Sequence, residues 1–318
     1  MTEKALVKSR RNTAAALCLL VLFLILLLLK NPSVATECVV RSLSLCARAI
    51  IPSLFPFMVL SELLIAFGFG DLFGQRLGRP LARLFGISAA SASAVFLGFL
   101  CGFPVGARMT LALYDKGQIP KGECERLLGF SNLPSIAFLV SAVGSSLYRN
   151  RSFGILLWLC CMAGTVTVGM LTRKKGASVK QAPRTSPPAP TPGAFTAAIA
   201  SATAAMLTVC AYILFFGTVI GCLSHALKRL ALGEAVNALL YGFFEISSGV
   251  GAAASLGNRP LSTALCALTV GWSGLSVHCQ LMTLADGRSL SFRPYFLARV
   301  AQALLCALLV FVLSPFVF

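Results

Sequence analysis

Long apolar stretches dominate the pattern of this chain, and polar residues interrupt them at short intervals. Thr13–Leu29 is the plainest, because it carries no charge over nearly the roughly 20 residues that a bilayer-spanning helix needs. It ends at Lys30-Asn31-Pro32 without a small-residue cleavage site, so we interpret it as a retained span rather than a signal peptide. Further spans are predicted at 52–69, 127–147, 152–172, 194–221 and 259–284, with a C-terminal one in 292–318.

Similar elements recur in the same order in two halves of the chain. Residues 173–193 are rich in proline, serine and charge, which predicts a flexible aqueous linker between the halves. Each half carries two interrupted apolar segments: GFLCGFPVGARMTLAL and GFSNLPSIAFLVSAVG, then GFFEISSGVGAAASLG and VGWSGLSVHCQLMTL. Weak internal symmetry of this kind is typical of repeat-built transporters. We therefore divide the chain into an N-terminus with the first span at 1–36, a repeat at 37–172, the linker at 173–193, a second repeat at 194–291 and a last span at 292–318.

The distribution of basic residues orients the predicted spans. They cluster before the first span, at Lys4, Lys8, Arg10 and Arg11, and in the linker, at Arg173, Lys174, Lys175, Lys180 and Arg184. Cytoplasmic segments carry such an excess, so an even number of crossings separates the two clusters. That count makes 88–114 and 234–256 re-entrant hairpins and the two repeats inverted. Lys228 and Arg229, which would then lie outside, count against this topology.

The interruptions are the candidate binding site, because a break in a membrane helix frees backbone groups that a ligand or side chain must satisfy. Hairpin tips and unwound helices that meet near the midplane would form a polar pocket. The alternative for each motif is that its small residues only allow close helix packing. The candidate substrate-binding residues are Gly102, Pro104, Gly106, Arg108, Asn132, Ser135, Glu245, Ser247, Ser248, Gly249, Ser273, Gly274, Ser276 and His278.

Charged side chains inside apolar segments are functional candidates, because burying them in a bilayer is costly. Glu245 ranks first among them and Glu62 last. Arg108 would add donors for an anion, which the hairpin tips also attract through their unpaired N–H groups. Arg108 and Glu245 also fit a structural ion pair with each other, and Glu245 is otherwise a candidate proton carrier.

Composition excludes several function classes. Hydrophobic residues make up 57% of the chain and charged residues 12%, which indicates solvation by lipid. The net charge of +17 lies in short loops and indicates orientation rather than nucleic-acid binding. With 12 cysteines but no C-x-x-C pair and only 2 histidines, we expect no metal and no cofactor. Gly271-Trp272-Ser273-Gly274 fits the pattern of intramembrane serine proteases, but His278 lies about 140° round the helix from Ser273. We therefore predict no enzyme.

Several ordered runs resemble the YlbJ-type sporulation integral membrane proteins: IPSLFPFMVLSELL, GFPVGARMTLALYDKGQI, ERLLGFSNLPS, FFEISSG and GWSGLSVHCQ. This family carries two nucleoside-recognition (gate) domains and is distantly similar to concentrative nucleoside transporters. The resemblance, which covers nearly all of Ile50–Arg299, implies a transport core of hairpins and broken helices. It also implies a role in endospore formation in the outer forespore membrane, moving dipicolinic acid toward the forespore. The chain departs from the family pattern after Asn132, where Leu133-Pro134-Ser135 replaces polar residues and Gly-Pro.

The sequence thus predicts an all-α polytopic membrane protein of about seven spans, with a re-entrant hairpin and a broken helix in each of two inverted repeats. The predicted function is transport of a small anionic solute, dipicolinate, coupled to an ion or a proton. A non-transporting scaffold for spore-envelope assembly and a transporter of a nucleoside-like solute are the alternatives. The direction of transport, the coupling ion and the oligomeric state stay open.

Overall fold

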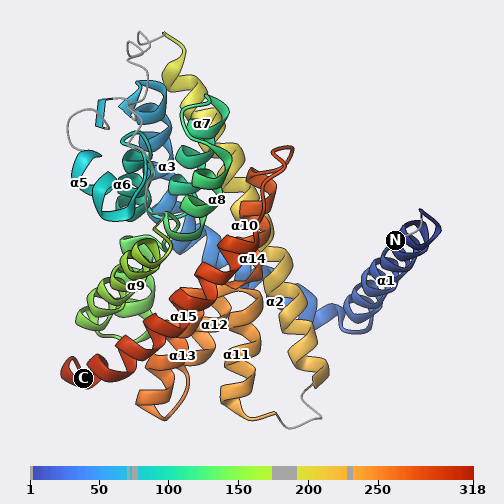
Figure 1. Cartoon of the computed structure of the whole chain (residues 1–318). Coiled ribbons are helices and arrows are strands. Elements are labelled where there is room, and N and C mark those ends of the chain that lie inside the picture. The colour runs from blue at the N-terminus through green and yellow to red at the C-terminus, as the bar shows by residue number, and fades with distance from the viewer. Residues whose placement is uncertain (1–2, 70–71, 74–77, 174–191, 228–231) are drawn as a thin grey trace.

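The structure is a computed structural model that describes residues 3–69, 72–73, 78–173, 192–227 and 232–318. Throughout these ranges the chain forms helices and no strands (Figure 1). Helices suit an apolar chain in lipid, because they satisfy every backbone N–H and C=O internally. The protein is therefore a polytopic α-helical membrane protein. Among the described residues, six stretches are long and apolar enough to cross a bilayer: Asn12–Lys30, Pro32–Ala66, Arg151–Leu171, Ala194–Leu227, Arg259–Leu284 and Arg293–Phe316.

The predicted span at 127–147 is interrupted, as the sequence predicted, and its crossing of the bilayer stays a prediction. Helix α8 (Lys121–Phe130) ends inside this segment, residues 131–135 are not helical, and the π-helix η2 (Phe138–Leu147) follows. Pro134 explains the interruption, because it lacks a backbone N–H and disfavours helical geometry at the residue before it. Neither α8 nor η2 is long enough to span a bilayer alone.

The predicted order of elements recurs in the two halves. Each half contains a long helical run, a helical hairpin, a broken helix and a second long helix. The first half consists of α2 (Pro32–Leu45), η1 (Cys46–Ile50), α3 (Ile51–Ala66), α5 (Gly78–Phe85), α6 (Ser91–Cys101), α7 (Val105–Asp115), α8, η2 and α9 (Arg151–Leu171). The second consists of α10 (Ala194–Leu227), α11 (Glu234–Phe244), α12 (Ile246–Ala254), α13 (Arg259–Trp272), α14 (Gly274–Leu284), α15 (Arg293–Leu313) and the 3-10 turn η4 (Ser314–Phe316). The inversion of one half relative to the other stays a prediction. Most of the 173–193 linker, with Lys228 and Arg229, lies outside the described residues.

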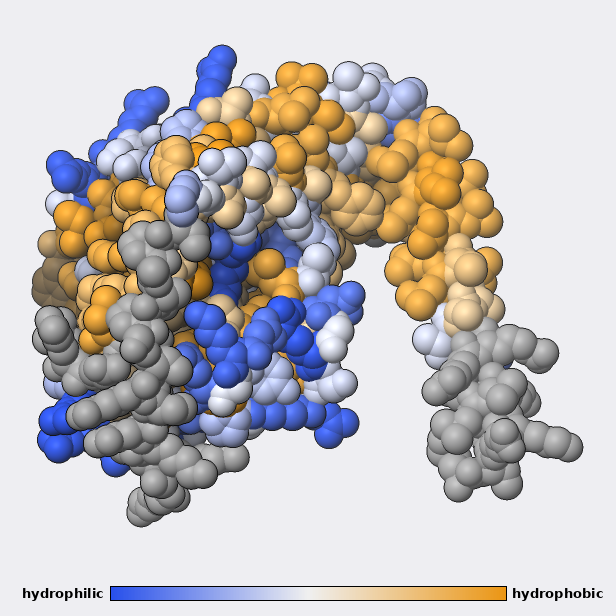
Figure 2. Space-filling model, turned by 90° about the horizontal axis from the view of Figure 1, so that it is seen from above, coloured by the Kyte–Doolittle hydropathy of each residue, from blue (hydrophilic) through white to orange (hydrophobic). Residues whose placement is uncertain are grey.

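Helix α1 (Glu3–Lys30) stands apart from the body. Figures 1 and 2 show it as an arm that leaves the other helices near α2. Only 6% of its apolar window is buried, and Leu19 is 67% exposed. Within a bilayer such a surface is solvated by lipid chains, so it needs no protein partner.

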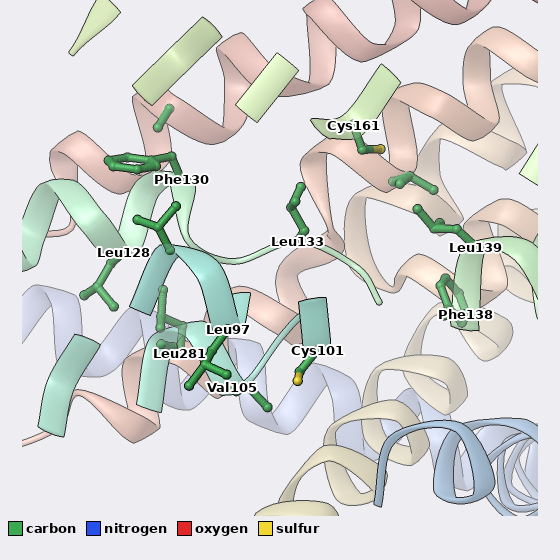
Figure 3. Packing of buried hydrophobic residues seen from close by; sticks show 14 of the residues in the cluster. Leu97, Cys101, Val105, Leu128, Phe130, Leu133, Phe138, Leu139, Cys161 and Leu281 are labelled. Carbon is green, nitrogen blue, oxygen red and sulfur yellow. The ribbon is translucent and has the colours of Figure 1, made fainter. Parts of the chain in front are cut away.

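The first hairpin packs closely on the first helix break. A Cβ added at Gly98 in α6 or at Gly106 in α7 would collide with the carbonyl oxygen of Ser131. Because glycine has no Cβ, the backbone at Ser131 can pack directly against both hairpin helices. Figure 3 shows Leu133 of this segment between the hairpin residues and those that follow the break, within one buried apolar core.

Polar contacts tie the two halves together at the end of the molecule where α7 and α14 finish. Arg288 makes a bidentate ion pair with Asp115, with Nε–Oδ1 and NH2–Oδ2 distances of 2.7 Å. The carboxylate of Glu125 accepts a hydrogen bond from the backbone N–H of Ser291 at 2.7 Å. Figure 2 looks down on the molecule and shows hydrophilic residues gathered around a hollow in the body.

Candidate functional site

All four predicted helix breaks contribute residues to one cavity. The cavity holds about 600 Å³ of space, counting its open side. Its walls are completed by apolar residues of η1, α3, η2 and α10. The lining residues are Ile50, Leu54, Phe103, Asn132, Leu133, Pro134, Ser135, Phe138, Val209, Ile213, Glu245, Ile246, Ser247, Ser273, Ser276, Val277 and Gln280.

In the first half, the hairpin tip is held against the unwound segment. Gly102 ends α6 with a positive φ of 78°, a conformation that favours glycine. The next residue, Phe103, donates its backbone N–H to the carbonyl of Leu133 at 2.6 Å. Ser135 then restarts the helix, because its hydroxyl accepts the N–H of Phe138 at 3.2 Å. These contacts place Phe103 and Ser135 in the cavity wall.

In the second half, the interrupted segment GFFEISSGVGAAASLG turns at Glu245, before its Ser247–Gly251 run, which was the expected break. Glu245 is extended and fully buried, and it caps α12. Its two carboxylate oxygens accept the N–H groups of Ser247 at 2.9 Å and of Ser248 at 2.6 Å. The helix begins this early because the carboxylate satisfies N–H groups that would otherwise be unpaired, and the partial positive charge of the helix end favours the anion.

The second broken helix turns at Ser273, which adopts the left-handed conformation with a φ of 78°. Gly274 follows with a φ of 79°, and a Cβ there would lie 3.0 Å from the backbone nitrogen of Ile246. This break therefore touches the tip of the second hairpin directly. No side chain caps α14, so its first N–H groups are available at the cavity.

Four side chains of the cavity wall carry buried polar atoms without a hydrogen-bond partner in the described part of the chain. They are Asn132 Oδ1, Ser247 Oγ, Ser276 Oγ and Gln280 Oε1. Buried polar atoms in folded proteins are nearly always paired, so a group of them on one cavity requires an explanation. A polar solute held in the cavity would supply the missing hydrogen bonds.

The structure brings together six of the predicted site residues and separates eight. The six that line the cavity are Asn132, Ser135, Glu245, Ser247, Ser273 and Ser276. The eight outside its wall are Gly102, Pro104, Gly106, Arg108, Ser248, Gly249, Gly274 and His278. Several of these eight shape the breaks, as Gly102 and Gly274 do, and Gly249 packs on Gly242 of α11. Sequence reasoning missed Gln280, although an amide within the apolar run after Ser276 was a usable signal.

Arg108 does not pair with Glu245. Its Nε lies 2.5 Å from the Glu62 carboxylate, and its NH2 donates to the hydroxyl of Ser201 at 2.5 Å. Glu62 was the charge ranked last as a functional residue, yet it is the partner of Arg108. The structural ion pair considered for Arg108 and Glu245 is therefore corrected to one between Arg108 and Glu62.

The chain is 28% identical to the "Sporulation integral membrane protein YlbJ" of Bacillus subtilis (strain 168), over 328 aligned positions that cover 92% of this chain and 80% of the relative. This similarity confirms the resemblance predicted from the motifs. The chain is thus similar to a sporulation integral membrane protein over most of its length. No protein-family model and no solved structure matches it.

Behind the cavity, the chain carries a buried polar cluster on α14 and α15. His278 Nδ1 lies 2.6 Å from the Tyr295 hydroxyl, and the Tyr295 ring lies beside the guanidinium of Arg299. Arg299 donates to the backbone carbonyl of Asn132, so the cluster reaches the first helix break. The hydroxyl of Ser273 donates to the carbonyl of Val270 at 3.2 Å, so it makes no hydrogen bond with His278.

Proposed function

We propose that this YlbJ-type protein carries a small anionic solute across a membrane by binding it where the four helix breaks meet. The observation that carries the proposal is the convergence of unpaired polar side chains from both halves on one cavity. Each buried polar group that is left unpaired destabilises the fold by about 1–3 kcal/mol. A purely structural scaffold would have no use for such groups. A binding site recovers that cost when the solute enters.

The chemistry of the walls supports an aromatic carboxylate. Phe103, Phe138 and Ile213 offer apolar surface for a ring. The hydroxyls of Ser247 and Ser276 can each donate a hydrogen bond to a carboxylate, and the uncapped first turn of α14 adds backbone donors and partial positive charge. Dipicolinate, a planar ring with two carboxylates, combines these features. The Bacillus relative is a sporulation integral membrane protein, which supports a role in sporulation.

One feature of the cavity favours the neutral, nucleoside-like alternative. The Nδ2 group of Asn132 donates to the Leu128 carbonyl at 2.8 Å, which leaves Oδ1 of this cavity residue as an unpaired acceptor among the described residues. An acceptor there matches an N–H or O–H group of a neutral solute. Uptake of a nucleoside in preference to dipicolinate would establish this alternative.

The test is uptake of labelled dipicolinate into vesicles that contain the purified protein. Ser276→Ala removes a hydroxyl that has no hydrogen-bond partner among the described residues, so it should not weaken folding, and Ser247→Ala removes the hydroxyl next to the Glu245 carboxylate. Both should reduce uptake, on the order of tenfold for the loss of one hydrogen bond to a charged group. Ser262→Ala is the matched control, because its buried hydroxyl bonds the Ala253 carbonyl at 2.7 Å and should affect folding only.

The outcome for a scaffold is different. Neither dipicolinate nor a nucleoside would then enter vesicles faster than into protein-free ones, and the alanine variants at 247 and 276 would behave as the wild type. That result would contradict the proposed transport function.

A further inference from the structure

Arg299 on α15 is a fully buried cation without an acidic partner. It is 1% exposed, and no carboxylate lies within ion-pair distance of it in the described ranges. Its NH1 group donates to Gln302 Oε1 at 2.9 Å, and its NH2 group donates to the backbone carbonyl of Asn132. The guanidinium carbon lies 5.5 Å from the centre of the Tyr295 ring, and Nε is recorded without a hydrogen-bond partner among the residues that the structure describes.

Two other arginines of the protein, Arg108 and Arg126, have groups that offset their positive charge. Arg108 is paired with Glu62 at 2.5 Å. Arg126 donates to three backbone carbonyls, of Phe85 at 2.8 Å, Gly86 at 2.7 Å and Thr172 at 3.4 Å, where two helices end. Helix C-termini carry partial negative charge, so Arg126 is offset by the fold itself. Arg299 donates to one backbone carbonyl and one neutral amide and lies against the Tyr295 side chain, and none of these three groups is a carboxylate.

Asn132 connects Arg299 to the cavity. Its backbone carbonyl accepts the hydrogen bond from Arg299, while its side-chain Oδ1 lies unpaired in the cavity wall. The Arg299 guanidinium is therefore separated from the cavity by a single residue of the wall, Asn132. Glu245 is the charged group in the wall itself, but two N–H groups and the N-terminus of α12 offset its carboxylate.

We propose that Arg299 sets the charge preference of the cavity. It acts as the fixed countercharge for a carboxylate-bearing solute and as the residue that positions Asn132. This inference rests on the proposed function and names the class of solute: small aromatic carboxylates, with two negative charges preferred over one and one over none. Burial strengthens the effect, because a charge in a medium of low dielectric acts over a longer distance than in water.

The experiment compares three substituted pyridines that differ in charge, in vesicles that contain the full chain. Dipicolinate carries two negative charges, picolinate one, and pyridine-2,6-dicarboxamide none. With Arg299→Gln, the preference for dipicolinate over the diamide should fall on the order of tenfold for each charge, while uptake of the diamide persists. Arg299→Lys should keep the order of preference, because it keeps the charge but loses the fork of donors.

Arg126→Gln is the matched control for the loss of a buried guanidinium. It should lower thermal stability and leave the ratio of dipicolinate to diamide uptake unchanged. An unchanged ratio in Arg299→Gln, or a ratio lost equally in Arg299→Lys, would overturn the inference while the transport function stands. If the wild-type protein moves none of the three solutes, the proposed function itself fails.

Discussion

The Glu62 carboxylate lies 2.5 Å from Nε of Arg108, and this ion pair is separate from the cavity wall. Leu54 and Glu62 are eight residues apart on α3, and Val209 and Ser201 are eight residues apart on α10. Both separations correspond to about 12 Å along a helix. The contacts among Glu62, Arg108 and Ser201 therefore join α3, α7 and α10 about two helical turns from the cavity wall.

We expect Glu62→Gln and Arg108→Gln each to lower the free energy of unfolding by about 1–3 kcal/mol, because each leaves a largely buried charge unpaired. The double variant should be less destabilised than the sum of the two single variants. Thermal unfolding of the four proteins in one detergent measures the coupling. Additive effects would show that the ion pair does not form.

Two glycines that occupy matching sequence positions should respond in opposite ways to alanine. Val105-Gly106-Ala107 and Val250-Gly251-Ala252 are the same tripeptide in the two halves. A Cβ at Gly106 would collide with the Ser131 carbonyl, whereas a Cβ at Gly251 would meet nothing within 4 Å. Gly106→Ala should cost about 1–3 kcal/mol or prevent accumulation, since the unwound backbone must move.

Gly251→Ala is the control for that substitution. It should be neutral or stabilise by roughly 0.5–1 kcal/mol, because alanine favours a helix more than glycine does. Unfolding midpoints measured side by side decide the comparison. Equal effects at 106 and 251 would contradict the close approach of the hairpin to Ser131.

The positions of the breaks could be predicted from sequence, because proline and glycine within apolar segments leave few alternatives. Pro134 and Gly102 lie where the helices stop. The hairpins at 88–114 and 234–256 were likewise placed correctly as helix pairs, observed as α6 with α7 and α11 with α12. The number of spans stays a prediction, because length and hydropathy identify six candidate helices and leave the broken segment at 127–147 undecided.

Partner choice within the site could not be predicted. Arg108 pairs with Glu62 because α3 packs against α7, a tertiary contact that no local pattern encodes. Glu245 was interpreted as an ion-pair partner of Arg108 or as a proton carrier. Because it adopts extended geometry before α12, its carboxylate instead accepts the N–H groups of Ser247 and Ser248. Arg299 was overlooked because it lies in an ordinary apolar helix near the end of the chain, and only the fold brings it to Asn132.

The cap at Glu245 should be measurable as stability. Glu245→Ala removes both acceptors for the N–H groups of Ser247 and Ser248 and should lower the free energy of unfolding by about 1–2 kcal/mol. Glu245→Gln keeps one acceptor oxygen and should cost less. Asn258, which caps α13 by accepting the N–H of Leu261 at an exposed position, offers a control through Asn258→Ala. Equal stability of wild type and Glu245→Ala would contradict the capping role.

The contact between the two halves at Asp115 and Arg288 should depend on pH in a defined direction. Hydrogen bonds from Arg288 hold the pKa of Asp115 below its ordinary value of 3.8, and the same hydrogen bonds raise the pKa of Arg288. A carboxyl with a lowered pKa in the folded protein adds stability that is fully present above the pKa of the unfolded chain. That stability is lost as the pH falls below 3.8 through the folded value.

Asp115→Asn should therefore lower the free energy of unfolding at neutral pH and have no effect in acid. The side chains of Asp115 and Arg288 are 47% and 29% exposed, so solvent screening limits the expected difference to about 1 kcal/mol. Unfolding midpoints of wild type and variant, recorded from neutral pH to about pH 2, should converge as the pH falls. Glu37→Gln is the control, because its pair with Arg41 is 69–73% exposed and should contribute little at any pH. A difference between wild type and Asp115→Asn that persists undiminished in acid would mean that the Asp115 carboxylate does not stabilise the junction through its charge.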